Sequence, residues 1–222
     1  MRPCAVALCA ISLLLDTSPV RAQGPAARLT APQVVSRLQA RYGKAKDLAA
    51  SFVQVHTDSL YNKRRTSRGV LWAAKPLKMR FDYARPERKS FISDGKTLWI
   101  YEPAAKQAFR SALSKRLATS LAFLFGSQQL SSAFRARFAP KGKYKPSKAG
   151  RLVLHLAPVK PTAHYTAIVL VVRPKDFVVE ESIVVSKHAT NRFTFSAIRF
   201  DAGVKAKRFT FEVPKGVKLM SR

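Results

Sequence analysis

The sequence of 222 residues predicts a mainly β fold (α+β), either an antiparallel barrel or a strongly curved sheet, in a single domain. Three observations support this. About ten segments alternate apolar and polar residues with a period of two, and turn residues separate these segments at short intervals. Only two stretches show the three-and-four spacing of a helix. No linker rich in Pro, Gly or Ser divides the chain.

The first 22 residues are typical of a secretory signal peptide. Arg2 supplies the positive start, residues 4–15 are apolar, and Val20-Arg21-Ala22 fits the small-x-small cleavage rule. The apolar stretch is too short to span a bilayer. The alternative is a buried first helix. We expect residues 1–22 to be removed and residues 23–222 to form one mature domain, free of cysteine and exported to a bacterial periplasm.

A helix is predicted over residues 31–42. Thr30 is a suitable N-cap, and Gln33 three residues later completes a capping box. Pro32 suits the first turn of a helix. Apolar residues then recur at helical spacing and form one stripe, and Gly43 is expected to end the helix.

Strands of two-residue period follow, with a polar and basic hairpin tip expected at residues 61–68. In residues 78–83, Met79 and Phe81 alternate with charged side chains, as in a sheet with one dry and one wet side. The other predicted strands are residues 48–55, 69–74, 152–156, 165–172, 178–185, 192–200 and 208–213.

The segment from Ser93 to Gln107 predicts a hairpin. Asp94-Gly95 is among the strongest two-residue turn signals, because type I′ turns need positive φ at both central positions. After the turn, Trp99 and Tyr101 fall on one face and Leu98 and Ile100 on the other. Both faces are therefore apolar, which predicts that the sheet is covered on both sides.

A second helix is predicted between Phe109 and Gly126, where leucines recur at three and four: Leu113, Leu117, Leu121 and Leu124, with Phe123 and Phe125 alongside. Its apolar face requires a partner surface. Two interpretations stay open: ordinary packing of a helix on a sheet, or a lid over the mouth of a hollow barrel.

The formal net charge is +29, and it becomes +28 without residues 1–22, which hold two arginines and one aspartate. Such a charge attracts nucleic acid, anionic membrane surfaces and acidic proteins. The basic residues are scattered and no nucleic-acid-binding motif is present, so we predict no specific nucleic-acid partner.

Enzyme motifs are also missing from the sequence. It contains no HExxH, GxSxG, P-loop or Rossmann fingerprint, and its four histidines are far apart. We therefore predict no catalytic residue, metal site or cofactor.

Three segments resemble the LolA family of periplasmic outer-membrane lipoprotein carriers: GVLWAAKPLKMRFDY, SDGKTLWIYEPAAKQ and FTFEVPKGVKL. The resemblance runs from the ASFVQ segment at residues 50–54 to Gly216. It implies an unclosed antiparallel β-barrel with a helical lid over a hydrophobic cavity. It also implies a monomeric carrier that accepts acylated lipoproteins from an inner-membrane ABC-type release complex and passes them to an outer-membrane acceptor.

Within this resemblance, lipid-contacting residues are expected on the strands and on the lid helix: Trp72, Met79, Phe81, Trp99 and Tyr101 from strands, and Leu117, Leu121, Phe123 and Leu124 from the lid. Plain core packing is the competing interpretation. Met79 suits irregular acyl chains because its side chain is flexible. Which strand face lines the cavity stays open.

Lys75 departs from the family pattern. The family typically has an arginine before the proline of this segment, which hydrogen-bonds the lid in its closed form. Lysine keeps the charge and loses the planar fork of donors, so a lid gated by Lys75 would be held less rigidly. The alternative is one more surface lysine.

Two further functions stay open. One is a related half-barrel that binds another amphiphile or senses the state of the envelope. The other, less favoured, is a basic protein that binds polyanions.

Overall fold

The computed structural model describes residues 29–113 and 130–221. In this part of the chain, twelve strands form one sheet in the order β12-β6-β5-β4-β3-β2-β1-β11-β10-β9-β8-β7. Their bounds are β1 Asp47–Asp58, β2 Lys63–Ala74, β3 Lys78–Arg85, β4 Lys89–Asp94, β5 Thr97–Glu102, β6 Gln107–Ala112, β7 Phe134–Phe138, β8 Leu152–Pro158, β9 Ala167–Arg173, β10 Val178–Val185, β11 Ala189–Phe200 and β12 Lys218–Ser221.

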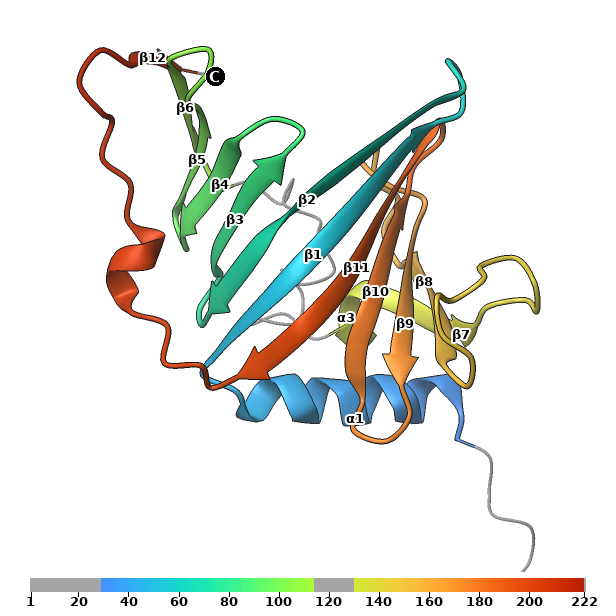
Figure 1. The fold of residues 1–222 in the computed structure, drawn as a ribbon. Coiled ribbons are helices and arrows are strands. Elements are labelled where there is room, and N and C mark those ends of the chain that lie inside the picture. Colours follow the sequence, from blue (N-terminus) through green and yellow to red (C-terminus); the bar gives the residue numbers. More distant parts are fainter. Residues whose placement is uncertain (1–28, 114–129, 222) are drawn as a thin grey trace, which may run out of the picture.

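Neighbouring strands are antiparallel except at one edge, where β12 pairs parallel with β6. The sheet curves strongly, as Figure 1 shows, and its edge strands β7 and β12 are not neighbours in the strand order of the described chain. The prediction of an unclosed antiparallel barrel is therefore confirmed.

Helix α1 (Ala31–Lys44) lies across one end of the sheet, below β1, β11, β10 and β9 in Figure 1. The predicted capping box is present, because Thr30 and Gln33 exchange both hydrogen bonds. Gly43 does not end the helix: α1 continues through Lys44 and is capped by Ala45 in an extended conformation. Val34 and Leu38 of its apolar stripe are completely buried.

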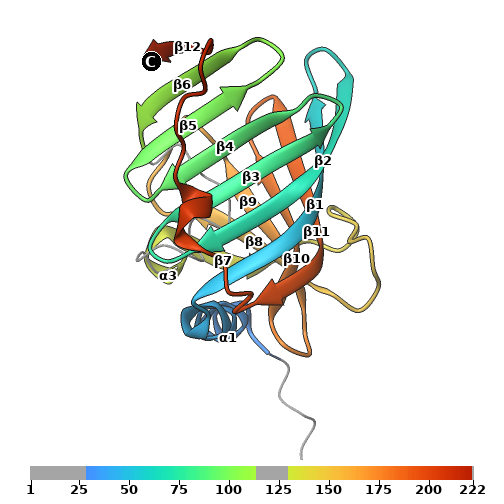
Figure 2. The same ribbon diagram turned by 60° about the vertical axis from the view of Figure 1, so that its left-hand side comes forward.

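The two faces of the sheet are covered by different parts of the chain. The inner face, on the concave side, packs with α1 and the short helix α3 (Leu130–Ala133) into the main hydrophobic core. The outer face of β3, β4 and β5 is crossed by residues 201–217, here called the C-terminal strap, as Figure 2 shows. The strap contains the 3₁₀ helix η1 (Ala206–Phe209).

The expected strand at residues 208–213 is wrong, because η1 and extended chain of the strap occupy it. The segment does alternate apolar and polar residues, but its Phe209 and Phe211 pack on the outer face of the sheet instead of belonging to a paired strand. Strand β12 forms further along, at the β6 edge.

The predicted hairpin of β4 and β5 is confirmed, with Ser93 paired to Leu98 and Ser90 to Tyr101. Its turn is not type I′, because only Gly95 of the central pair has positive φ. Asp94 acts through its side chain, whose Oδ1 accepts hydrogen bonds from the backbone N–H groups of Thr97 (2.7 Å) and Lys96 (2.8 Å). The Thr97 hydrogen bond holds the pKa of Asp94 below its usual value.

The start of the second predicted helix is also wrong. Phe109 lies in β6 and pairs with Ile100 of β5. Residues 114–129, which hold most of the expected lid helix, lie outside the described residues, as does the expected signal peptide. None of the helices in the described ranges is long and apolar enough to cross a membrane.

Candidate functional site

An aromatic cluster occupies the middle of the inner face. Phe52 of β1 lies at its centre, with ring centroids 4.9 Å from Tyr83, 5.6 Å from Phe81 and 5.8 Å from Phe193. Phe195 stacks on Phe193 at 6.2 Å. Strand pairing produces this arrangement, because Phe52 is in register with Phe195 on one side and with Gly69 on the other. We call these five aromatic residues the inner wall.

Gly69 allows the Phe52 ring to approach the backbone of β2 closely. A Cβ atom at Gly69 would be 2.7 Å from the Phe52 ring and 2.2 Å from the backbone oxygen of Asp82. Both separations are shorter than van der Waals contact, so only glycine fits between the two strands at this point.

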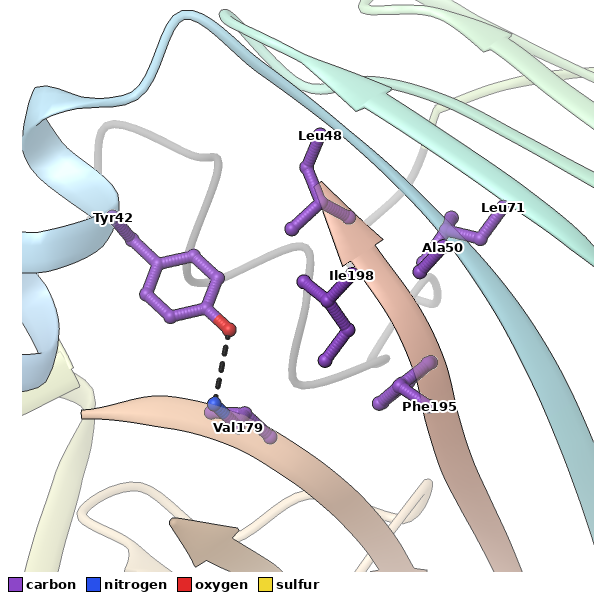
Figure 3. A pocket seen from close by; sticks show the side chains of 7 residues that line it. All are labelled: Tyr42, Leu48, Ala50, Leu71, Val179, Phe195 and Ile198. Atoms are coloured by element: carbon purple, nitrogen blue, oxygen red, sulfur yellow. Dashed lines mark hydrogen bonds between the residues drawn. The ribbon is translucent and has the colours of Figure 1, made fainter. Parts of the chain in front are cut away.

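The inner wall is buried in this structure. Phe52 is 2% exposed and Phe81 is 4% exposed. Where α1 meets the sheet, a cavity of about 10 Å³ lies among Tyr42, Val179 and other apolar side chains, shown in Figure 3. This is about the volume that one water requires. Acyl chains can therefore reach this region only if the side chains that fill it move.

Tyr42 joins α1 to the far side of the cavity. Its hydroxyl accepts a hydrogen bond from the Val179 backbone N–H at 3.1 Å, drawn in Figure 3. Burial raises the pKa of the Tyr42 hydroxyl above its usual value, so it stays neutral. This bond is a buried polar contact between α1 and β10.

A larger hollow of about 350 Å³ lies beside the helices. It is lined by Pro32, Val35, Ser36 and Gln39 of α1 and by Ser131, Phe134 and Ala136 of α3 and β7. Its size falls within the range of about 300–1,000 Å³ that is common for small-molecule sites. The lining is partly polar, which distinguishes it from the inner wall.

The inner face becomes polar toward the end of β1 that points away from α1. The Tyr83 hydroxyl donates to Gln54 Oε1 at 2.7 Å, and Gln54 Nε2 donates to Asn191 Oδ1 at 2.9 Å. His56 Nδ1 lies 3.0 Å from the same Asn191 oxygen. These side chains satisfy one another at the boundary between the inner wall and solvent.

The structure places the five strand residues predicted to contact lipid on two different faces. Met79 and Phe81 lie on the inner face and belong to the main core. Trp72 is in register with Arg80, so it points outward, where the Arg208 guanidinium lies 4.1 Å from its ring centroid.

Trp99 and Tyr101 also lie on the outer face. The ring of Phe211, in the C-terminal strap, is 5.3 Å from the Trp99 ring and 5.2 Å from the Tyr101 ring. On β5 the inner face carries Leu98 and Ile100 instead, because these residues are in register with Ser93 and Phe91 of β4. The predicted lid residues Leu117, Leu121, Phe123 and Leu124 lie outside the described residues.

Lys75 lies in the turn between β2 and β3. Its ammonium group donates a hydrogen bond to the carbonyl oxygen of Gly43, in the last turn of α1. A cation at this position satisfies a free carbonyl and complements the negative end of the helix dipole. The side chain therefore fastens the C-terminal end of α1 to the sheet.

Four inner-wall residues were not predicted to contact lipid: Phe52, Tyr83, Phe193 and Phe195. Each is an apolar residue in an alternating segment, and that signal was visible. For Phe52, Phe193 and Phe195 the missing information was the pairing of β1 with β11, which joins segments far apart in the chain.

Comparisons with known proteins bear on this arrangement. The family model described as outer membrane lipoprotein carrier protein LolA matches residues 43–212, most of the chain. The chain belongs to the LolA family. An outer-membrane lipoprotein carrier protein of Chromobacterium violaceum is 32% identical over 201 residues, covering 88% of this chain and 93% of the relative. Another, from Alkalilimnicola ehrlichii, is 26% identical over 216 residues, covering 96% and 92%.

Among solved structures, an uncharacterized conserved protein from Thermus thermophilus has the same fold. It aligns with a TM-score of 0.56 at 11% identity, covering 86% of this chain and 99% of its own. This likeness concerns the fold alone. The matched segment of the LolA family includes all five residues of the inner wall, which places the aromatic cluster inside the family domain.

Proposed function

We propose that this protein is a periplasmic carrier that binds the acyl chains of lipoproteins released from the inner membrane and delivers them to the outer membrane. One observation carries the proposal: an aromatic wall lines the concave face of an open half-barrel that belongs to the LolA family. The binding site is this inner wall together with Met79, Leu71 and the apolar faces that cover them.

The physical need for such a site follows from the cargo. A lipid anchor with two or three acyl chains carries several tens of methylene groups, and each contributes roughly 0.8 kcal/mol on transfer out of water. Free diffusion of the anchor through an aqueous compartment is therefore excluded. A carrier has to bury these chains and also release them, which argues against a rigid, optimally shaped cavity.

A wall that is buried by the protein itself meets both requirements. When cargo enters, an acyl chain replaces protein side chains on the wall, so the wall exchanges one apolar contact for another. The net cost of opening is then a few kcal/mol, the range of an ordinary shift in conformational population. Met79, which is 1% exposed, has a flexible side chain that adapts to chains of irregular shape.

The proposal includes a helical lid at residues 113–125, with Leu117, Leu121, Phe123 and Leu124 facing the acyl chains. Lys75 would take part by holding the end of α1, one of the covers of the wall, through the Gly43 carbonyl. Loss of this bond would loosen the C-terminal end of α1, while Tyr42 and the buried apolar stripe still hold the rest of the helix, and in this sense Lys75 would gate the site.

Cellular partners follow from the same proposal. The donor is an inner-membrane ABC-type release complex, the acceptor is an outer-membrane lipoprotein acceptor, and residues 1–22 direct export. The protein acts as a monomer and without covalent chemistry. The large positive charge would accelerate encounters with acidic or anionic surfaces, so transfer should slow as salt rises.

Displacement of a fluorescent hydrophobic probe by a diacylated peptide tests the binding site. Phe81→Ala removes an inner-face ring and should weaken acyl binding about tenfold, equivalent to about 1.4 kcal/mol. Trp99→Ala, the matched outer-face variant, should change binding by less than about twofold. Equal effects of the two variants, with both shown to be folded by thermal unfolding, would contradict an inner binding wall.

The lid is tested separately by Leu121→Glu, which should impair probe binding while leaving the fold intact. Unchanged displacement would count against the lid but not against the wall. Material purified from the periplasm distinguishes the alternatives: a bound lipoprotein supports the carrier, whereas free lipid without protein favours a half-barrel for other amphiphiles. A protein that binds polyanions would instead show steeply salt-dependent DNA binding that a blocked cavity does not alter.

A further inference from the structure

The hairpin between β1 and β2 ends in two exposed apolar side chains. Leu60 is 63% exposed and Tyr61 is 71% exposed, the highest values among the large apolar residues of the described chain. Figure 1 shows this hairpin projecting from the sheet at the end away from α1. Neither side chain belongs to the core cluster, so packing within the described part of the fold does not explain them.

The tip is held in a defined shape. Asp58 Oδ1 accepts hydrogen bonds from the backbone N–H groups of Leu60 (2.9 Å) and Tyr61 (3.2 Å). Ser59 is fixed to the neighbouring turn between β10 and β11, because its N–H and its hydroxyl both donate to the carbonyl oxygen of His188, at 2.8 and 2.7 Å. Leu60 and Tyr61 are thus presented on a braced turn.

Cations surround the two apolar side chains. Lys63, Arg64 and Arg65 follow the turn directly and are exposed, and Lys187 lies in the adjacent turn. We call Leu60, Tyr61 and these four cations the basic tip. The Lys63 ammonium lies 5.9 Å from the centroid of the Tyr61 ring, so positive charge reaches the apolar pair itself.

The carboxylates of Asp58 and Glu87, close to the basic tip, already have partners within the protein. Asp58 accepts the two turn hydrogen bonds, and Glu87 pairs with Arg65 at 2.5 Å. Arg64, Lys63 and Lys187 have no ion-pair partner among the described residues. Three cations therefore stand free beside an exposed leucine and tyrosine.

We infer that the basic tip docks reversibly on an anionic phospholipid surface, with Leu60 and Tyr61 entering the interface and the cations facing lipid headgroups. Transfer of the leucine side chain from water into the interface is favourable, and tyrosine suits the headgroup region because its ring is apolar and its hydroxyl is polar. Cations near an anionic bilayer add attraction. The small apolar pair and the cluster of cations together produce stable binding, which neither produces alone.

The shape of the tip favours a membrane over an acidic protein. Leu60 and Tyr61 are exposed on a projecting turn and are flanked by cations, a combination that suits the apolar interior and the anionic headgroups of one lipid interface. Docking in this way also orients the molecule. Strand β1 runs from the tip through His56 and Gln54 to Phe52, so the inner wall would open along the strand that reaches the bilayer.

The experiment is co-sedimentation of the mature chain with vesicles of phosphatidylcholine alone and of phosphatidylcholine mixed with phosphatidylglycerol. Binding is expected only to the mixed vesicles. Leu60→Ser combined with Tyr61→Ser should weaken it about tenfold at every salt concentration, and Lys63→Glu combined with Arg64→Glu should weaken it most at low salt. Both pairs are exposed, so the thermal unfolding temperature should not change.

A matched control makes the same change of charge elsewhere. Lys141→Glu combined with Lys175→Glu alters two exposed lysines away from the tip and should leave vesicle binding within about twofold of the original protein. An equal loss in the control, or full binding by the Leu60 and Tyr61 variant, would overturn the inference.

Binding to polyglutamate as tight as to vesicles, and insensitive to the Leu60 and Tyr61 changes, would assign the tip to an acidic protein instead. Probe displacement by the tip variants should be normal, which separates this test from that of the carrier function.

Discussion

Replacing Gly69 with alanine should destabilise the protein by about 3 kcal/mol, the upper end of the range for an overpacked core. The added Cβ would lie 2.2 Å from the Asp82 backbone oxygen, and a backbone atom cannot turn aside as a side chain can. It would also lie 2.7 Å from the Phe52 ring. That ring cannot move freely, because Phe81 and Tyr83 pack against it at 5.6 and 4.9 Å.

Gly43→Ala is the matched control. A Cβ at Gly43 meets nothing within 4 Å, and the residue lies inside α1, where alanine is preferred to glycine by about 0.5–1 kcal/mol. This variant should therefore be slightly more stable than the original protein. The same chemical change should thus have opposite signs at the two glycines.

Urea unfolding followed by circular dichroism measures both variants. With a slope of about 2 kcal/mol per molar urea, Gly69→Ala should lower the midpoint by about 1.5 M. Probe binding should weaken as well, because Phe52 is displaced from the centre of the inner wall. A Gly69→Ala midpoint within about 0.2 M of the original would refute the close approach of β2 to Phe52.

Three further outcomes are expected. Lys75→Ala should lower the free energy of unfolding by about 1 kcal/mol and speed amide hydrogen exchange in the last turn of α1. Lys75→Arg should leave this exchange slow. Unchanged exchange in Lys75→Ala would show that the hydrogen bond to Gly43 does not hold the helix. Phe211→Ala should lower the free energy of unfolding by about 1–2 kcal/mol and shift tryptophan fluorescence to the red, because the C-terminal strap no longer covers Trp99. An unshifted spectrum would argue against this contact. The hydrogen bond from Arg151, followed by the charges around it, holds the pKa of Glu180 below its ordinary value of 4.5. The Glu180 carboxylate therefore contributes its full stabilisation above pH 4.5, and this stabilisation is lost as pH falls through the lower pKa of the folded state. Glu180→Gln should be less stable than the original protein at neutral pH, and its free energy of unfolding should fall less on acidification. If the free energies of unfolding of the two proteins fell equally with acid, the result would contradict this.

Much of the local structure could be predicted from the sequence. The capping box of Thr30 and Gln33, the alternation around Met79 and Phe81, and the turn at Asp94-Gly95 all led to the correct elements, because each depends on neighbours within a few residues. Errors arose where a local signal had more than one structural use. The alternation at residues 208–213 suits a strand, but also an extended strap whose phenylalanines insert into a sheet face.

The sequence indicates which strand residues are apolar, but it does not assign them to the inner or the outer face. The alternating aromatic and methionine residues of the strands do form apolar surfaces, but Met79 and Phe81 lie on the inner face, whereas Trp72, Trp99 and Tyr101 lie on the outer face. A period of two assigns residues to two faces without saying which face is inner. Where both faces are apolar, as on β5, the pattern alone cannot decide.

The sequence by itself determined that this chain forms curved antiparallel β structure with a capped helix and belongs among lipoprotein carriers, because capping, alternation and family motifs are local properties. Only the tertiary structure decided which residues form the wall. The pairing of β1 with β11 brings Phe52 to Phe193 and Phe195, and the C-terminal strap covers Trp99 and Tyr101 with Phe211. Both contacts join segments that are far apart in the chain. Such contacts form only when the whole sheet packs, so local sequence patterns do not reveal them.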